Sequence, residues 1–211
     1  MRLNSDKSAT QELASSPTLF SEDRQPDSDY LLVPIHSSEN RNFVPFAFLS
    51  AEVIVGNSCM AIPNASLYIF GVITSTMHMV WLSFVGGRIN SDYRYSNTIV
   101  YNNFPWPTPP TAEARQAVEA AAQAVLDARA AHPGSTLADL YDPLAMPPDL
   151  RAAHRALDAR VERLYRPKRF AHDTERVQHL FECYATLSAP LAPAAPAPAK
   201  RRGRASSPPT D

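Results

Sequence analysis

Apolar and polar positions change their pattern twice along the chain. In the first half, short apolar runs alternate with turn segments such as SSENRN and GNS. Runs of this length predict short strands, and the short connections between them favour antiparallel pairing. The first two runs each contain a proline, which is typical of strands at a sheet edge because proline has no N–H for the ladder. The predicted strands cover residues 30–36, 43–49, 53–55, 59–63 and 67–70.

The apolar positions then change to helical spacing, which predicts one helix over residues 74–85. Thr74 or Ser75 is a candidate N-cap for this helix. Gly86 and Gly87 predict its end, because glycine enters the left-handed backbone region readily. The apolar positions with this spacing are Met77, Val80, Trp81 and Phe84.

Beyond residue 108 the chain becomes rich in alanine and predicts a helical segment. Thr111 is a candidate cap for a helix that ends near Ala131, and residues 137–141 predict a short helical turn. A second long helix follows Pro148, and Asp173 is a candidate cap for a third. The apolar faces of these helices must pack on one another or on the sheet. The second helix has an apolar seam of Leu150, His154, Leu157, Val161 and Leu164, and the third carries Val177, Leu180, Phe181, Tyr184 and Leu187.

These patterns together predict an α+β fold. Residues 24–107 are predicted to form a small antiparallel or mixed β domain with one packed helix, and residues 108–188 an α-helical C-terminal segment. Residues 1–23 are polar and without periodicity, which predicts a polar N-terminal arm. Residues 189–211 are rich in proline and alanine with a few arginines, which predicts a disordered tail.

The charge of the chain is nearly balanced, with 20 Lys and Arg against 21 Asp and Glu. No predicted folded segment is basic, whereas a protein that binds nucleic acid through phosphates needs a surplus of Lys and Arg. Any contribution of this chain to DNA binding is therefore expected to be base reading more than affinity. The arginines of residues 151–166 are expected to form a solvated helical face, with a phosphate-binding patch as the alternative.

The stretch with the richest chemistry is GGRINSDYRYSNTIVYNNFPWP, residues 86–107. Asn, Asp and Arg side chains can read base edges through paired hydrogen bonds, and Tyr and Trp can stack or anchor. This composition indicates a recognition segment. The alternative is a β-hairpin whose Tyr, Ile and Val side chains pack on a sheet.

Motifs of catalysis are absent from the sequence. It has no glycine-rich phosphate loop, no GxSxG and no HExxH, and its cysteines, Cys59 and Cys183, do not form a CxxC pair. His78 lies in an apolar run and is expected to be a core histidine. We therefore predict no catalytic, cofactor-binding or metal-binding residues in this chain. The few cysteines, the absence of an apolar leader and the broken apolar run of residues 69–85 predict a cytoplasmic protein without a membrane partner.

Several segments in the same order resemble one known family. They are RQPDSDYLLVP, FVPFAFLS, IPNASLYIFGVITSTMHMVWL, GRINSDYRYSNTIVYNNFPWP and AAAQAVLDARAAHPGSTLADLYDPLAMPPDL. Together they resemble the C-terminal part of MmeI-like enzymes, single-chain type II restriction and adenine-N6 methylation proteins. The resemblance covers about four fifths of the chain. It implies a target-recognition domain over residues 24–107 that binds double-stranded DNA, while the methyltransferase domain, which binds S-adenosylmethionine, would lie outside this chain.

The resemblance also implies which residues read bases. One set lies in the GRxxSxYRYS motif, at Asn90, Asp92 and Arg94, and the other lies around Asn57 and Ser58. Members commonly place a charged residue, such as Lys or Glu, at the position of Asn90. The chemistry agrees, since Asp accepts from cytosine, Arg can be bidentate to guanine and Asn suits adenine. In an extended segment the alternation would place the first three side chains on one side.

Other functions remain open at this point. The helical segment could instead dock a separately encoded methyltransferase domain, and an adjacent reading frame with methyltransferase motifs would favour this. The chain could also be a non-functional gene remnant, which poor solubility would favour. A small hydrolase would need a nucleophile and a base in contact, and the sequence offers no such pair.

Overall fold

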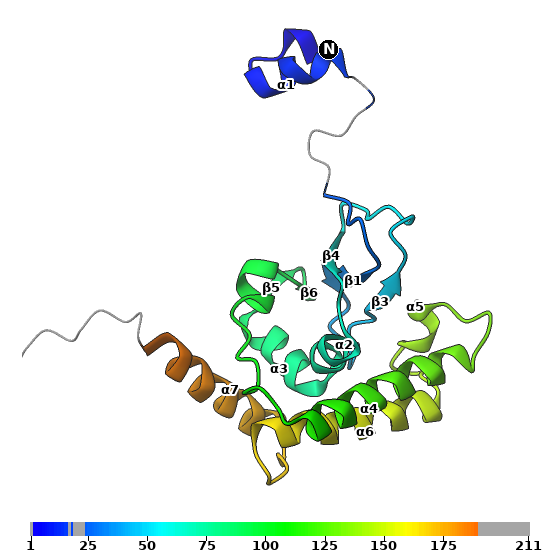
Figure 1. Ribbon diagram of the computed structural model, residues 1–211, viewed down its shortest axis with the longest axis vertical. Helices are drawn as coiled ribbons and strands as arrows, with labels where there is room; N and C mark the ends of the chain where they lie inside the picture. Colours follow the sequence, from blue (N-terminus) through cyan, green and yellow to red (C-terminus); the bar gives the residue numbers. More distant parts are fainter. Residues whose placement is uncertain (1, 17, 19–23, 190–211) are drawn as a thin grey trace, which may run out of the picture.

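The computed structural model of the protein describes residues 2–16, 18 and 24–189 (Figure 1). Part of the predicted N-terminal arm forms helical turns, η1 (Arg2–Asn4), α1 (Ser8–Glu12) and η2 (Leu13–Ser15), and Figure 1 shows α1 apart from the other elements. Residues 1, 17 and 19–23 of this arm lie outside the described residues. The same holds for all of the predicted tail after Ala189.

Two small antiparallel sheets form the β part of the fold. The short runs predicted the strands of the first, whereas the second arises mainly from the hairpin that was the alternative for residues 86–107. In one sheet, β1 (Tyr30–Pro34) lies between β3 (Ala47–Leu49) and β4 (Cys59–Pro63). In the other, β6 (Asp92–Arg94) lies between β2 (His36–Ser37) and β5 (Gly87–Ile89). The α+β class is thereby confirmed.

The predicted strands at 43–49 and 53–55 are largely wrong. Only Ala47–Leu49 pairs with β1, while Phe43, Val44 and Phe46 are buried in the core without a strand ladder. Pro45 interrupts this segment and has no N–H to donate to a neighbouring strand. Residues 53–55 form no strand.

Residues 67–70 form a helix, so their prediction as a strand is also wrong. The helix α2 (Leu67–Thr74) is followed at once by α3 (Thr76–Val85), and the two axes differ by 58°. Ser66 caps α2, because its side chain accepts from the Ile69 N–H at 3.3 Å. Both helices are apolar on nearly all sides. Their sequences therefore lack the spacing of apolar and polar residues that distinguishes a helix from a strand. Among the described residues no single helix has the length and apolarity to cross a membrane, although the bent α2–α3 pair together meets that composition and length.

The end of α3 depends on glycine for a different reason from the predicted one. Gly86 has φ −66° and ψ 148°, an extended conformation that any residue adopts. A Cβ at this position would lie 2.4 Å from the Leu82 carbonyl oxygen. Gly86 is therefore required for room beside the last turn of α3, and the predicted left-handed conformation is wrong.

The second half is helical, as predicted. Its helices are α4 (Ala112–Ala130), α5 (Leu137–Leu140), α6 (Pro148–Tyr165) and α7 (Asp173–Ser188). Thr111 caps α4 by accepting from the Ala114 N–H at 3.3 Å, whereas α7 is capped by His172 and not by Asp173. The predicted seam of α6 is buried except for the half-buried Leu164.

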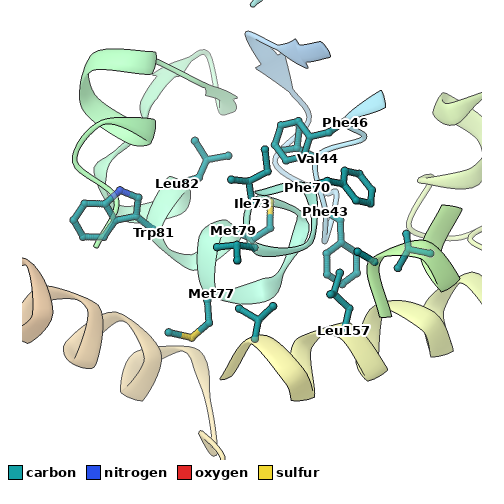
Figure 2. Close-up of a cluster of buried hydrophobic side chains, with 14 of the residues drawn as sticks. Phe43, Val44, Phe46, Phe70, Ile73, Met77, Met79, Trp81, Leu82 and Leu157 are labelled. Carbon is teal, nitrogen blue, oxygen red and sulfur yellow. The ribbon is translucent and has the colours of Figure 1, made fainter. Parts of the chain in front are cut away.

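The helical half and the β half share one core. At Gly71 of α2, an added Cβ would meet Val118 and Ala122 of α4 and Leu157 of α6 at 3.0–3.3 Å. Glycine thus allows α2 to lie directly against both long helices, which run side by side in Figure 1. Figure 2 shows Phe43, Phe70 and Leu157 gathered in this common cluster. The boundary predicted near residue 107 therefore separates two segments that pack as a unit.

A polar link also joins the two halves. The Arg129 guanidinium of α4 donates to the Phe46 carbonyl oxygen at 2.7 Å and to the Tyr141 hydroxyl at 2.8 Å. That hydroxyl contacts Nε2 of His154 at 2.8 Å, and Phe43 stacks on the His154 ring. Burial lowers the pKa of His154 to about 3, so this histidine is neutral in the link.

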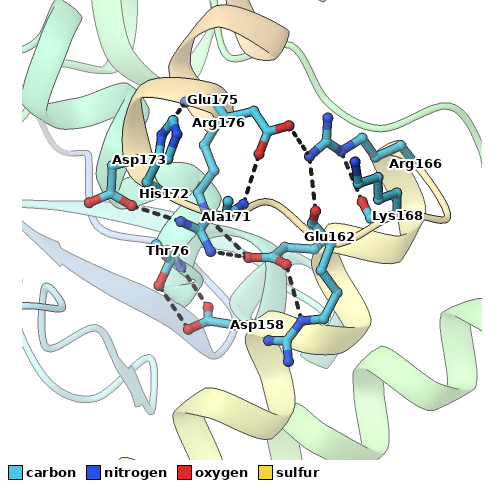
Figure 3. A network of polar contacts seen from close by, with 11 residues as sticks. Thr76, Asp158, Glu162, Arg166, Lys168, Ala171, His172, Asp173, Glu175 and Arg176 are labelled. Carbon is cyan, nitrogen blue, oxygen red and sulfur yellow. Dashed lines mark hydrogen bonds and ion pairs between the residues drawn. The ribbon is translucent and has the colours of Figure 1, made fainter.

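A carboxylate of the helical half caps a helix of the β half (Figure 3). Asp158 of α6 accepts from the Thr76 N–H at 2.7 Å and from the Thr76 hydroxyl at 2.8 Å, at the first turn of α3. The Ser75 hydroxyl donates to the Val72 carbonyl oxygen instead and gives α3 no cap of its own. One turn further along α6, the buried Glu162 binds the Arg176 guanidinium of α7. Asp158 therefore supplies the N-terminal acceptor that α3 lacks.

We predict that this cap has a measurable stability and pH dependence. Asp158→Ala should lower the free energy of unfolding at pH 7 by about 1 kcal/mol, because the α3 N-terminus loses its acceptor. Asp158→Asn, which keeps an acceptor, should lower it less. Urea denaturation measures both, and equal losses in the two variants would contradict the capping role.

The pH dependence has a defined sign. Burial raises the pKa of the Asp158 carboxyl from its ordinary value of 3.8 to about 6. The Asp158 carboxyl therefore binds its proton more tightly in the folded state than in the unfolded chain. Between pH 7 and pH 4, acidification should stabilise the wild type relative to Asp158→Asn. A constant difference across that range would show that Asp158 titrates normally.

Candidate nucleic-acid interface

The segment of residues 87–94 forms a β-hairpin with Asn90 in its turn. Gly87 pairs with Arg94, and Ile89 pairs with Asp92 at the closed end. Asn90 has φ +56°, a left-handed conformation that asparagine tolerates better than most residues. The expectation that Asn90 alternates with the other two residues in one extended segment is therefore wrong. Asp92 and Arg94 do alternate along β6, and both are exposed.

Some side chains of this hairpin support its turn, and others keep hydrogen-bonding groups that could contact DNA. Arg88 donates to the carbonyl oxygens of Ser91 and Ser83 and lies over the Tyr93 ring, so it stiffens the turn. Asp92 uses Oδ1 to accept from the Glu39 N–H at 3.2 Å. Within the described part of the chain, no hydrogen bond engages the Arg94 guanidinium. The available groups are therefore one Asp92 carboxylate oxygen, the complete Arg94 guanidinium and the exposed Asn90 amide.

The second predicted segment is the turn that leads into β4. The Cys59 N–H donates to the Gly56 carbonyl oxygen at 3.0 Å, which closes the turn and leaves Asn57 and Ser58 exposed. Beside this turn lies a groove of about 770 Å³ between residues 24–26, residues 54–57 and β4. Asn57 thus lines a concave surface, and Ser58 is exposed on the turn beside it.

Ile35 joins the two predicted segments. The ladder of β1 and β4 ends at Pro34, and the ladder of β2 and β6 begins at His36, so the chain changes sheets at Ile35. The Ile35 N–H donates to the Ser58 carbonyl oxygen at 2.9 Å, and its carbonyl oxygen accepts from the Tyr95 N–H at 2.7 Å. Tyr95 directly follows Arg94. Ile35 therefore fixes the distance between the end of the turn and the end of the hairpin.

The residue that follows the hairpin, Tyr95, is also anchored on α3. The Tyr95 hydroxyl lies 2.8 Å from Nε2 of His78 on α3, and both residues are buried. Burial lowers the pKa of His78 to about 3, which keeps its imidazole neutral. The prediction of a core histidine at this position is consistent with this burial.

The exit of the 86–107 stretch packs on the core. Residues Asn97–Tyr101 form a π-helical turn, η3, that Ser96 caps. Trp81 of α3 donates its indole N–H to the Val100 carbonyl oxygen at 3.0 Å. Trp106 lies edge-on to Phe104 and Tyr101, so its ring packs within the protein. Its aromatic residues therefore anchor this stretch on the core, while Asn90, Asp92 and Arg94 stay exposed. A role of the stretch in recognition stays a prediction.

The chemistry available at this surface is hydrogen bonding. Asp92 offers an acceptor, Arg94 offers donors, and Asn57 and Ser58 offer both kinds of group. In the ranges 2–16 and 24–189, no three His, Cys, Asp or Glu side chains are grouped as a metal site would require. Along α6, Arg151, Arg155, Arg160 and Arg163 are exposed, whereas Arg166 is paired with Glu175 at 2.7 Å.

Sequence reasoning did not identify Ile35 as part of this surface. Its role depends on two backbone hydrogen bonds to segments distant in the chain. The one local signal is Pro34, which cannot continue a ladder on its N–H side. The sequence likewise gives no local signal for Gln25, which binds the loop before Asn57.

The chain matches known protein families over nearly its whole length. Residues 1–108 match the model of the MmeI target recognition domain, and residues 111–192 match that of the MmeI C-terminal domain. DNA methyltransferase A of Bacillus subtilis (strain 168) is 38% identical over 187 residues, which are 89% of this chain and 21% of that protein. A solved structure of the type IIL restriction-modification enzyme MmeI in complex with DNA is 45% identical, with a TM-score of 0.84 over 89% of this chain and 25% of that chain. The chain thus spans a fifth to a quarter of the length of these relatives.

We predict that Asn90 shapes the hairpin turn through its left-handed backbone. Asn90→Gly should retain the stability of the chain, because glycine adopts φ near +56° without strain. Asn90→Val should lower the free energy of unfolding by at least about 1 kcal/mol, because a β-branched residue is strained there. Thermal or urea unfolding of both variants measures this. Equal stability of the Gly and Val variants would contradict the turn geometry.

Proposed function

This chain belongs to the MmeI family, and on that premise we propose that it reads a specific sequence in double-stranded DNA. The reading surface consists of the β5–β6 hairpin and the Asn57–Ser58 turn. The observation that carries the proposal is the Ile35 junction, which fixes these two exposed polar segments beside each other. Two segments held at a fixed distance can contact neighbouring bases of one DNA site.

Base reading is assigned by side-chain chemistry. Asp92 would accept from a cytosine amino group, Arg94 would donate to guanine, and Asn57 or Asn90 would pair with adenine. Ser58 can contact any of these bases. Each good contact is worth roughly 1–3 kcal/mol of discrimination against the wrong base.

The catalytic activities of the family are proposed to lie outside this chain. The relatives are named a DNA methyltransferase and a restriction-modification enzyme, and this chain spans only a fifth to a quarter of them. We propose that a methyltransferase region binding S-adenosylmethionine acts on the sequence that this chain selects. No side chain described above is assigned a catalytic step.

A second candidate function is the docking of a separately encoded methyltransferase domain. Large apolar side chains are exposed where α3 and α7 pack together, with Phe84 61%, Phe181 44% and Leu187 62% exposed. Phe181 lies 5.4 Å from the Trp81 ring, so the exposed group continues into the core. Such an apolar surface favours contact with another protein region.

We predict that Asp92→Ala alters which sequence the chain prefers. Loss of its carboxylate should reduce the preference at one base position by about fivefold or more. Competition binding between duplexes that differ at single positions measures this. Asp127→Ala, the same substitution on the exposed side of α4, is the control and should leave every preference unchanged. An unchanged preference in Asp92→Ala would remove the hairpin from the reading surface.

We predict a different effect for the exposed arginines of α6. Arg155→Ala should weaken binding to all duplexes alike and should make the negative slope of log K against log salt shallower by about 0.9, if this arginine contacts one phosphate. Arg115→Ala is the control, since Glu119 already engages that guanidinium at 2.9 Å. No effect at all would favour a solvated face for these arginines, and an effect confined to one sequence would indicate a base contact instead.

A further inference from the structure

The loop before the Asn57–Ser58 turn makes three hydrogen bonds to the Gln25 side chain. The Gln25 amide nitrogen donates to the carbonyl oxygens of Ala51 and Val53, both at 2.9 Å. Its amide oxygen accepts from the Val55 N–H at 3.0 Å. These three bonds reach alternate residues of a segment that forms no strand. The Gln25 amide therefore replaces the neighbouring strand that this segment lacks.

Apolar packing contributes little to this loop. The Ile54 and Val53 side chains are 72% and 45% exposed, so neither fixes the loop to the core. The fully buried Tyr30 adds one more polar contact, since its hydroxyl donates to the Val53 carbonyl oxygen at 2.6 Å. Hydrogen bonds to the loop backbone thus determine its path.

The position of the turn follows from that path. The Ile35 N–H fixes the turn at the Ser58 carbonyl oxygen, on the side of β4. Gln25 fixes the other side at the Val55 N–H, two residues before Asn57. With both sides fixed, the Asn57 and Ser58 side chains point from a defined backbone.

We infer that Gln25 is a positioning residue for sequence recognition, which sets where Asn57 and Ser58 meet the bases without touching DNA itself. This inference rests on the proposed function. It goes further, because it assigns specificity to a side chain outside both predicted reading segments. A site held within a fraction of an ångström discriminates bases, whereas the same side chains on a loose loop do not.

The chemistry requires glutamine at this position. Its amide supplies two donors and an acceptor at one end of the side chain, which matches two carbonyl oxygens and one N–H. Glutamate would keep the acceptor for Val55 but would place a carboxylate against the Ala51 and Val53 carbonyl oxygens. Alanine would remove all three bonds. The two substitutions therefore separate the acceptor role from the donor role.

The first test follows the loop in the full 211-residue chain without DNA. In Gln25→Ala the Val55 amide should exchange with solvent roughly tenfold faster, because its hydrogen bond is lost. Amides of α4 should keep their exchange rates, which shows that the fold is intact. An unchanged Val55 rate would overturn the inference. Gln25→Glu provides a second variant should the alanine variant not fold, and its loop should loosen around Ala51 and Val53.

The second test follows sequence preference. The base positions read by the turn are those whose preference falls in Asn57→Ala or Ser58→Ala. At these positions Gln25→Ala should reduce the preference by about fivefold or more, while the position sensitive to Asp92→Ala keeps its preference. Gln123→Ala on the exposed face of α4 is the control and should change neither. A uniform loss of affinity at all positions would mean that Gln25 serves stability alone, which would overturn the inference.

The outcomes separate this inference from the proposed function. If Asp92→Ala changes the preference but the turn variants and Gln25→Ala do not, the inference fails and the proposed function stands. If the wild-type chain prefers no sequence, both fail. In that case the Val55 exchange rate still shows whether Gln25 holds the loop.

Discussion

The arrangement of the candidate reading surface depends on the two backbone hydrogen bonds of Ile35. Its N–H donates to Ser58 beside β4, and its carbonyl oxygen accepts from Tyr95 just after β6, so one residue links the two sheets. Backbone bonds of this kind do not depend on the identity of the exposed side chains around them. The residues at the turn and in the hairpin can therefore vary in chemistry while their spacing stays the same, which is what a recognition surface requires.

The helical half has a structural role in that arrangement. Its two long helices approach α2 at Gly71, and its Asp158 caps α3. The hairpin in turn is anchored on α3 through Tyr95 and His78. A continuous set of contacts thus runs from α6 through α3 to the base-reading candidates. The two matched family regions accordingly form one packed unit rather than independent domains.

The sequence predicted the features that local patterns encode, and it missed those that depend on distant contacts. The helices α4 to α7 follow from apolar periodicity and caps such as Thr111. The helix α2 was predicted as a strand, because a segment that is apolar on all sides carries no period. The bonds of Gln25 and Ile35 arise from tertiary geometry that no local pattern reports, whereas the left-handed turn at Asn90 is a local hairpin feature that the extended-segment prediction missed. The base-reading assignments of Asp92 and Arg94 stay predictions, now with exposed positions on one strand.

Selection of the purified chain on a randomised pool of DNA duplexes at low salt tests the central claim most directly. Sequencing of the bound fraction would reveal any preferred site. If the hairpin and the turn read bases as one surface, the bound pool will be enriched in a short motif with adjacent specified positions. A folded chain that binds duplexes without enriching any motif would contradict the claim.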